Sequence, residues 1–141
     1  MRVFFDSSSL AKRYIDEQGS SEIESILYDT TQLAVSIIVI PEILSGLNRR
    51  VREGVITLED YKIIKKQFAE DMEDMIVLQL APKVISTSTS LLEKNTLRAM
   101  DALHIACAIE WNATLFVTSD KRQLLAAKHA GLELNYVGPE Q

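Results

Sequence analysis

Short apolar runs and longer amphipathic segments alternate along the whole chain. Five of the runs are short, carry no charged residue and are rich in β-branched or aromatic side chains, which is typical of buried strands. These runs occupy residues 3–5, 33–36, 75–80, 114–118 and 134–137. Residues between them recur at helical spacing, and we expect helices over residues 10–16, from 21 onwards, and over 38–52, 58–70, 82–92, 97–111 and 121–129.

Strands that alternate with helices favour an α/β fold with right-handed crossover connections. The pattern therefore predicts a single domain over residues 1–141, with a central, mostly parallel sheet of about five strands flanked by helices. Local signals support this interpretation. Ser7-Ser8-Ser9 supply an N-cap for the first helix, and Pro41 suits the first turn of a helix better than a central strand. The segment 97–111 is apolar almost all round, so we expect that helix to be buried.

The net charge of the chain is −5, whereas nucleic-acid-binding proteins are more often basic. The negative charge therefore argues against nucleic-acid binding, but two observations weaken that argument. A bound cation can cancel several acids that are gathered in one site. The basic residues are also clustered rather than scattered, in Lys12-Arg13, Arg49-Arg50-Arg52, Lys65-Lys66 and Lys121-Arg122.

The apolar runs are all much shorter than the ~20 residues that span a bilayer. Met1 and Arg2 lead directly into the first predicted strand, so we expect neither a membrane segment nor a signal peptide. The single cysteine, Cys107, lies among apolar residues and is expected to pack in the core. Together these features predict a cytoplasmic protein.

Four acidic residues lie where a core-forming sequence would ordinarily place an apolar one. Asp6 follows the first strand, and Asp120 follows the fourth. Glu42 stands directly after Pro41 in an otherwise apolar helix start, and Asp101 interrupts the helix predicted to be buried. Because strand ends and helix starts of a parallel sheet meet at one edge, we expect these carboxylates to converge.

Converging carboxylates repel one another unless positive charge lies between them. Hard oxygen ligands with no cysteine nearby favour Mg²⁺ or Mn²⁺ over zinc. Such a cation can hold a phosphodiester, lower the pKa of a bound water and stabilise the leaving oxygen. The sequence therefore predicts a metal centre that acts on phosphodiesters, with Asp6, Glu42, Asp101 and Asp120 as its metal-binding and catalytic residues.

Each acid also has a purely structural interpretation. Asp120 can cap a helix, Glu42 can be a first-turn acid favoured by the helix dipole, and Asp6 can bond to the serine amides. Asp101 is the hardest to explain in this way, because a charge on a helix that is apolar all round needs a partner. A purely structural interpretation would have to be correct for each of the four acids independently, so we favour the metal centre.

Four segments carry a more specific pattern. They are strand-Asp6-Ser7-Ser8-Ser9-Leu10, the helical Glu42, Arg98-Ala99-Met100-Asp101-Ala102-Leu103-His104-Ile105-Ala106, and Val117-Thr118-Ser119-Asp120. In this order and spacing they resemble the signatures of the PIN-domain family, and in particular the VapC-type toxins of toxin–antitoxin pairs. The likeness covers essentially the whole chain, and the helical Asp-Ala-Leu-His-Ile-Ala segment followed by strand-Thr-x-Asp is its most specific part.

The resemblance implies a PIN-like domain that acts as a Mg²⁺- or Mn²⁺-dependent endoribonuclease on RNA. It also implies a homodimer and a cognate antitoxin whose C-terminal segment lies across the active-site groove. Some family members have a further acid after the last one, but here Lys121, Arg122 and Gln123 follow, so a fifth acidic ligand is not supported. Asp6, Glu42, Asp101 and Asp120 match the family's metal-binding acids, and Thr118 with Ser7 or Ser8 match the hydroxyl positions that line its site.

Nearby cationic and imidazole side chains have two interpretations each. Possible RNA phosphate contacts are Arg49, Arg50 and Arg52, which follow Glu42 on its helix, and Lys12 and Arg13, which follow Asp6. Phosphate contacts contribute affinity but no sequence specificity. The alternative is that these cations only form a solvent-exposed helix face. His104 follows Asp101 by three residues on the same helical face, which permits metal ligation, but we favour a buried, hydrogen-bonded structural role.

Other functions fit the pattern less well. A phosphoacceptor receiver domain needs paired acids after the first strand, and a phosphatase with an Asp-x-Asp nucleophile needs a second acid there, whereas Ser7-Ser8 follow Asp6. Two alternatives stay open within the family. They are a PIN nuclease that processes RNA without being a toxin, and a PIN-fold binding module without catalysis.

Overall fold

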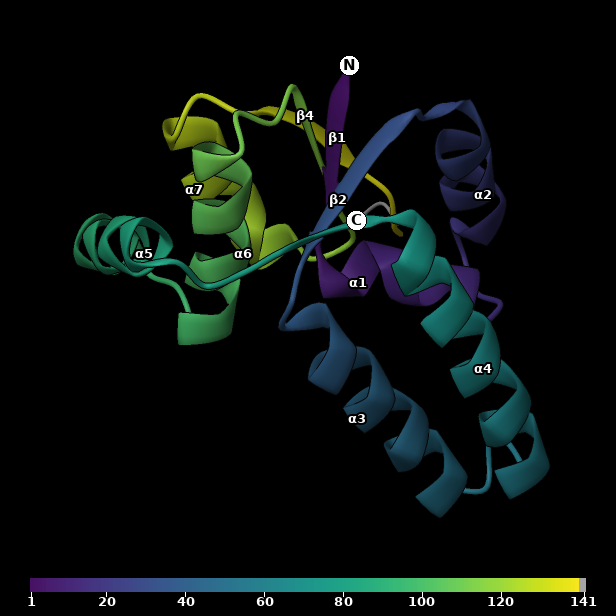
Figure 1. Ribbon diagram of the computed structural model, residues 1–141. Helices are drawn as coiled ribbons and strands as arrows, with labels where there is room; N and C mark the ends of the chain where they lie inside the picture. The colour runs from purple at the N-terminus through teal and green to yellow at the C-terminus, as the bar shows by residue number, and fades with distance from the viewer. Residues whose placement is uncertain (140–141) are drawn as a thin grey trace.

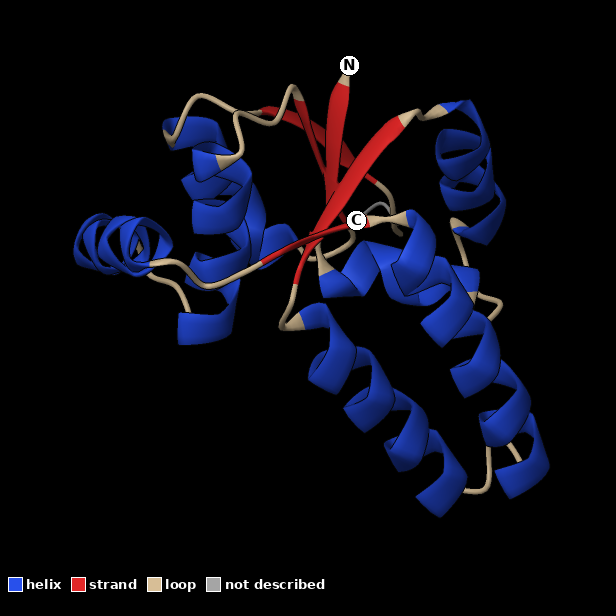
Figure 2. Cartoon of the chain, viewed as in Figure 1, coloured by secondary structure: helices blue, strands red, loops and turns tan. Residues whose placement is uncertain are grey.

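The core of the computed structural model, which describes residues 1–139, is a sheet of five parallel strands between two layers of helices (Figure 1; Figure 2). Neighbouring strands are parallel throughout, and their order is β3-β2-β1-β4-β5. This confirms the predicted α/β class. The strands are β1 (Arg2–Phe5), β2 (Gln32–Ser36), β3 (Ile76–Leu78), β4 (Leu115–Thr118) and β5 (Glu133–Tyr136).

The helices follow the strands as the alternating pattern predicts. The α-helices are α1 (Ser7–Leu10), α2 (Ser20–Asp29), α3 (Val39–Arg52), α4 (Leu58–Asp74), α5 (Pro82–Lys94), α6 (Ala99–Glu110) and α7 (Leu124–His129). Two short 3₁₀ helices are η1 (Ala11–Arg13) and η2 (Lys121–Gln123). Among residues 1–139 no helix is both long enough and apolar enough to cross a membrane.

The alternating side chains of β1 divide the core in two. Val3 and Phe5 point into a cluster with the buried faces of α1 to α4. Phe4 points the other way, stacks on Phe116 of β4, and joins a cluster with α5, α6 and α7. Figure 1 shows these two helical layers on opposite sides of the strands, with α3 and α4 forming an antiparallel pair that extends beyond the sheet. The helix α6 is buried on most of its surface, as predicted, and it includes the buried Cys107.

Several predicted boundaries are wrong, and the first helix differs most. We expected a helix over 10–16 capped by serines, but α1 begins at Ser7 and gives way to η1 after one turn. The cap is Asp6, whose extended backbone lets its side chain accept a hydrogen bond from the Ser9 amide. Elsewhere α4 continues to Asp74, β3 covers only three residues, and the last predicted helix is split into η2 and α7.

The strand order creates a crevice beside the central strand. The chain builds outward from β1 to β2 and β3, then returns to place β4 and β5 on the other side of β1. Open α/β sheets bind ligands at such a reversal point, outside the carboxyl ends of the strands. Here the reversal lies between β1 and β4, which end just before Asp6 and Ser119.

Candidate metal-dependent active site

The four predicted acids lie around this crevice and come from four different elements. Asp6 follows β1, and Asp120 follows β4. Glu42 lies in the first turn of α3, and Asp101 lies in the first turn of α6. Asp6 and Asp101 are buried, whereas Glu42 and Asp120 are partly exposed. Asp6, Asp101 and Asp120 are linked through Gln123 and Arg98, whereas Glu42 pairs with Ser7 and His104. The role of the four acids as metal ligands stays a prediction.

Hydroxyl and amide donors surround the Asp6 carboxylate. The Ser9 amide and the Ser9 Oγ donate to its Oδ1, each at 2.9 Å. Thr118 Oγ1 donates to its Oδ2 at 2.6 Å, and Ser8 Oγ lies 2.9 Å from both oxygens. Burial raises the pKa of Asp6, and the charge of His104 and the hydrogen bonds from Thr118, Ser9 and Ser8 only partly offset that rise. The carboxylate is therefore held in one orientation at an energetic cost.

An uncharged side chain joins Asp6 to Asp101. Gln123, at the end of η2, donates through Nε2 to Asp6 Oδ2 at 2.9 Å and to Asp101 Oδ1 at 3.2 Å. On its other side, Asp101 accepts a hydrogen bond from Arg98 Nε at 3.1 Å. Arg98 is the N-cap residue of α6, so the helix start itself places this guanidinium beside the acid.

Two arginines neutralise Asp120. Its carboxylate accepts from the Arg122 guanidinium at 2.9–3.2 Å, and Arg98 Nη2 lies 3.6 Å from its Oδ2. Burial favours a higher pKa for Asp120, but the hydrogen bonds and charge of Arg122 and the charge of Arg98 outweigh it and lower the pKa. Asp120 also caps η2 through the Arg122 amide, so the structural interpretation of this acid and its predicted role in the site coexist.

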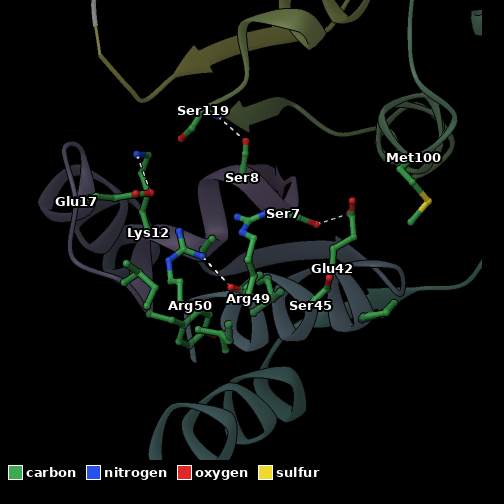
Figure 3. A pocket seen from close by; sticks show the side chains of 17 residues that line it. Ser7, Ser8, Lys12, Glu17, Glu42, Ser45, Arg49, Arg50, Met100 and Ser119 are labelled. Atoms are coloured by element: carbon green, nitrogen blue, oxygen red, sulfur yellow. Dashed lines mark hydrogen bonds and ion pairs between the residues drawn. The ribbon is translucent and has the colours of Figure 1, made fainter. Parts of the chain in front are cut away.

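Glu42 forms a separate arm of the site with Ser7 and His104. Ser7 Oγ donates to Glu42 Oε1 at 2.6 Å, a contact drawn in Figure 3. His104 Nε2 contacts the same oxygen and lies 3.1 Å from Ser7 Oγ. Burial favours a higher pKa for Glu42, yet hydrogen bonds from His104 and Ser7 and the charges of His104 and Arg98 lower it. His104 is buried and hydrogen-bonded, as expected for the structural role that we favoured.

The donor set suits a hard divalent cation, although the acids do not form a ready-made ligand shell. Within residues 1–139, no group of three or more His, Cys, Asp or Glu side chains is spaced to hold a metal ion. Gln123 lies between Asp6 and Asp101, and Glu42 is turned toward Ser7 and His104. Three buried polar atoms of residues around the acids have no hydrogen-bond partner in the described part of the chain. Such atoms need an explanation, and a bound ion or water is one of those that apply. The three atoms are His104 Nδ1, Ser119 Oγ and Gln123 Oε1.

A groove of about 630 Å³ leads away from the acids between α1, η1 and α3 (Figure 3). Ser7, Ser8, Glu42 and Ser119 form the end nearest the acids. Further along, cationic side chains line both walls, namely Lys12 on η1 and Arg49 and Arg50 on α3.

The five basic residues predicted as phosphate contacts therefore divide into two sets. Lys12, Arg49 and Arg50 line the groove, but the Lys12 ammonium is already engaged by Glu17 Oε1 at 3.2 Å. Arg13 instead binds Asp71 at 2.8 Å and Glu24 at 2.9 Å, on the side of η1 that faces α2 and α4. Arg52 is an exposed residue of the last turn of α3.

Sequence reasoning gave neither Arg98 nor Gln123 a role in the site and gave Ser9 only a capping role, although each contacts a predicted acid. The Arg98–Asp101 pair could have been predicted from the sequence, because side chains three positions apart at a helix start can pair. The sequence gave less indication of the contacts of Gln123. Its position, one short turn after Asp120 and directly before two leucines, is compatible with burial of a polar side chain.

The fold and site define a class: a parallel α/β domain with acidic residues gathered at the reversal point of its sheet. The sequence model of the PIN domain matches residues 3–129, and the chain belongs to the PIN-domain family. No curated protein matches the chain at a significant level.

Solved structures of low sequence identity share this fold. VapBC2 from Rickettsia felis, bound to a DNA fragment from its promoter, is 14% identical, with 99% of this chain and 100% of that chain covered and a TM-score of 0.70. FitAcB from Neisseria gonorrhoeae is 11% identical, with 94% and 95% covered and a TM-score of 0.71. The sarcin–ricin-loop-cleaving toxin VapC20 from Mycobacterium tuberculosis is 14% identical, with 88% and 94% covered and a TM-score of 0.69.

Proposed function

We propose that this protein is a Mg²⁺- or Mn²⁺-dependent endoribonuclease that serves as the toxin of a toxin–antitoxin pair. The observation that carries the proposal is the joining of Asp6 to Asp101 through Gln123, and of Asp101 to Asp120 through Arg98. Glu42, the fourth acid, lines a groove that also has cationic walls. Membership of the PIN-domain family, whose members include nucleases, supports the same activity.

The metal-binding part of the proposal assigns a divalent cation to Asp6, Asp101 and Asp120, with Glu42 as the acid on the opposite wall. When bound, the cation would supply Lewis-acid stabilisation of the phosphoryl group and lower the pKa of an attacking water. The hydroxyls of Ser8, Ser9 and Thr118 fix the orientation of the Asp6 carboxylate. Residues that hold a ligand in one orientation are needed in such sites, because misplaced ligands lose affinity.

The groove is the proposed path of the RNA strand. Ser7 and Glu42 line the groove together, and its cations, Lys12, Arg49 and Arg50, lie further along it. Arg49 and Arg50 lie two turns after Glu42 on the same helix, so a phosphodiester held at the acids leaves neighbouring phosphates within reach of α3. The clustering of these cations beside the site explains how a chain of net charge −5 can bind RNA locally.

A partner protein and a second copy of the chain complete the proposal. A solved structure of similar fold, 14% identical to this chain, is described as a toxin–antitoxin complex from Klebsiella pneumoniae. By analogy we propose a cognate antitoxin that covers the groove, a homodimer, and a cytoplasmic location. A role in RNA processing without an antitoxin is the alternative, and co-purification with the product of a short neighbouring reading frame would distinguish the two.

Cleavage of a panel of structured RNAs tests the activity directly. Wild-type protein is incubated with Mg²⁺, Mn²⁺ or EDTA beside the Asp101→Asn variant, which removes one charge from the buried acid with little change in volume. We expect cutting in both metals, none in EDTA, and a loss of at least about 100-fold in the variant, because even outer partners of metal ligands contribute 10–100-fold.

A matched control keeps this test specific. Asp29→Asn makes the same chemical change at an exposed residue at the end of α2, and it should cut like wild type. Cutting that persists in EDTA or in the Asp101→Asn variant would contradict the proposal. Mn²⁺ binding without cleavage of any RNA would reduce it to a metal-binding PIN domain.

A further inference from the structure

Gln123 is the polar side chain that the proposed chemistry leaves unexplained. Only 3% of its surface is exposed, and its amide group lies between two buried carboxylates. A primary amide has two N–H donors, and here one points to Asp6 Oδ2 and the other to Asp101 Oδ1. The residues it joins lie 117 and 22 positions away in the sequence, so this contact links β1, α6 and η2.

The amide nitrogen lies between the two carboxylates and contacts an oxygen of each. Two adjacent carboxylates repel each other, and the partial positive charges of the N–H groups offset that repulsion without adding net charge. The oxygen atom of the same amide, Oε1, is buried and has no hydrogen-bond partner among the described residues. Gln123 is therefore held from its nitrogen side alone, and what it binds there are the two proposed metal ligands.

We infer that Gln123 is a positioning residue that substitutes for the divalent cation in the metal-free protein and thereby weakens metal binding. This inference rests on the proposed metal centre. The amide bridge keeps Asp6 and Asp101 close together when no metal is bound, and an incoming cation competes with it for Asp6 Oδ2 and Asp101 Oδ1. Metal affinity is then set partly by a neutral side chain and not only by the acids.

The inference predicts two effects of opposite sign. Removal of the amide leaves the two acids without their shared donor, so the metal-free protein becomes less stable. The same removal ends the competition at the acids, so the cation binds more tightly. A residue with only a structural role gives the first effect without the second, and a residue whose oxygen serves as a metal ligand gives weaker binding.

Titration calorimetry with Mn²⁺ tests this on the full chain after EDTA treatment and buffer exchange, together with thermal unfolding in EDTA. We expect Gln123→Leu to unfold at a lower temperature in EDTA and to bind Mn²⁺ roughly tenfold more tightly than wild type, since hydrogen bonds to charged groups are the stronger ones. Gln67→Leu makes the same change on the exposed face of α4 and should alter neither quantity. If Gln123→Leu does not fold, the unbranched Gln123→Met serves in its place.

The outcomes separate this inference from the proposed function. A Gln123 variant that binds Mn²⁺ as wild type does, or more weakly, overturns the role of Gln123 while leaving the metal centre intact. Absence of Mn²⁺ binding in wild type and in both Gln123 variants overturns the metal centre and this inference together. Binding in a Gln123 variant that exceeds binding in wild type supports both.

Discussion

Asp6 illustrates how a single residue of this site opposes the stability of the fold. The carboxyl is fully buried, and its pKa is raised above the ordinary value of 3.8 because burial disfavours its charged form. A folded-state pKa above the unfolded one means that the energetic cost is absent at low pH and grows as pH rises toward and through the folded pKa. The folded protein therefore bears the free-energy cost of a buried charge, which a neutral side chain at position 6 would not impose.

Replacement of Asp6 by asparagine should therefore stabilise the metal-free protein in a pH-dependent way. We expect the stability of Asp6→Asn relative to wild type to increase from pH 4 to pH 8, because only the wild-type side chain becomes charged over this range and burial disfavours that charge. Urea unfolding in EDTA at both pH values measures the difference. Asp29→Asn, at an exposed site, should show no such trend, and a difference at Asp6 that does not vary with pH would contradict the argument.

The sequence was more informative about the acids than about the hydrogen-bond partners that other elements bring to them. Asp6, Glu42, Asp101 and Asp120 could be selected because each breaks a local apolar pattern. The bridge from Gln123 to Asp6 could not, because it joins positions 117 residues apart and depends on side-chain placement that periodicity does not encode. Hydrogen-bond partners across elements become visible only when the elements have been packed.

At the scale of elements, α3 combines three tasks along its length. Its first turn carries Glu42, its inner face packs Ile43 and Leu47 in the core, and its last two turns carry the arginines. The apolar stripe and the proline near its start made it predictable from 38 to 52, close to the observed Val39–Arg52. The first helix was not predictable in the same way, because the Asp6 cap moves its start to Ser7 and the following turn tightens to 3₁₀.

The arginines of α3 should differ in their contribution to RNA binding. Arg49 and Arg50 line the groove, whereas Arg52, on the same helix, is exposed in its last turn. We expect Arg49→Ala and Arg50→Ala each to weaken RNA binding and to reduce the salt dependence of log K by roughly 0.7, the value for one phosphate contact to a single strand. Filter binding at several salt concentrations, with the cleavage-deficient Asp101→Asn background, gives these slopes.

Arg52→Ala is the matched control for that measurement, since it removes the same charge from the same helix. It should leave the salt slope close to that of the parent protein. Equal slopes for all three variants would mean that the RNA does not follow the groove and responds only to net charge.

At the scale of the whole molecule, metal binding should be linked to global stability. The proposed ligands belong to the loop after β1, to α6 and to the loop after β4, so the ion would bind the folded chain and not the unfolded one. We expect Mn²⁺ at about 100 times its Kd to stabilise the fold by about 2.7 kcal/mol, in a manner reversed by EDTA. Thermal unfolding measures this, and an equal gain in Asp101→Asn would show that the ion binds elsewhere.

The architecture was partly predictable from the periodicity of apolar residues. The alternation of apolar runs and amphipathic segments sufficed for an α/β class with about five mostly parallel strands. The order β3-β2-β1-β4-β5 was not specified, because periodicity identifies strands without stating which of them are neighbours. That order is what sets Asp6 beside Thr118, whose hydroxyl donates to the Asp6 carboxylate.

The central position of β1 also bears on when the candidate site can form during synthesis of the chain. β1 must wait for β4, which lies more than 100 residues later in the sequence, before the two strands can pair. A nascent chain that has reached α6 has three of the acids but lacks Asp120, Thr118 and Gln123. The nuclease activity proposed above therefore requires that β4 and η2 have been synthesised and packed beside β1 and α6.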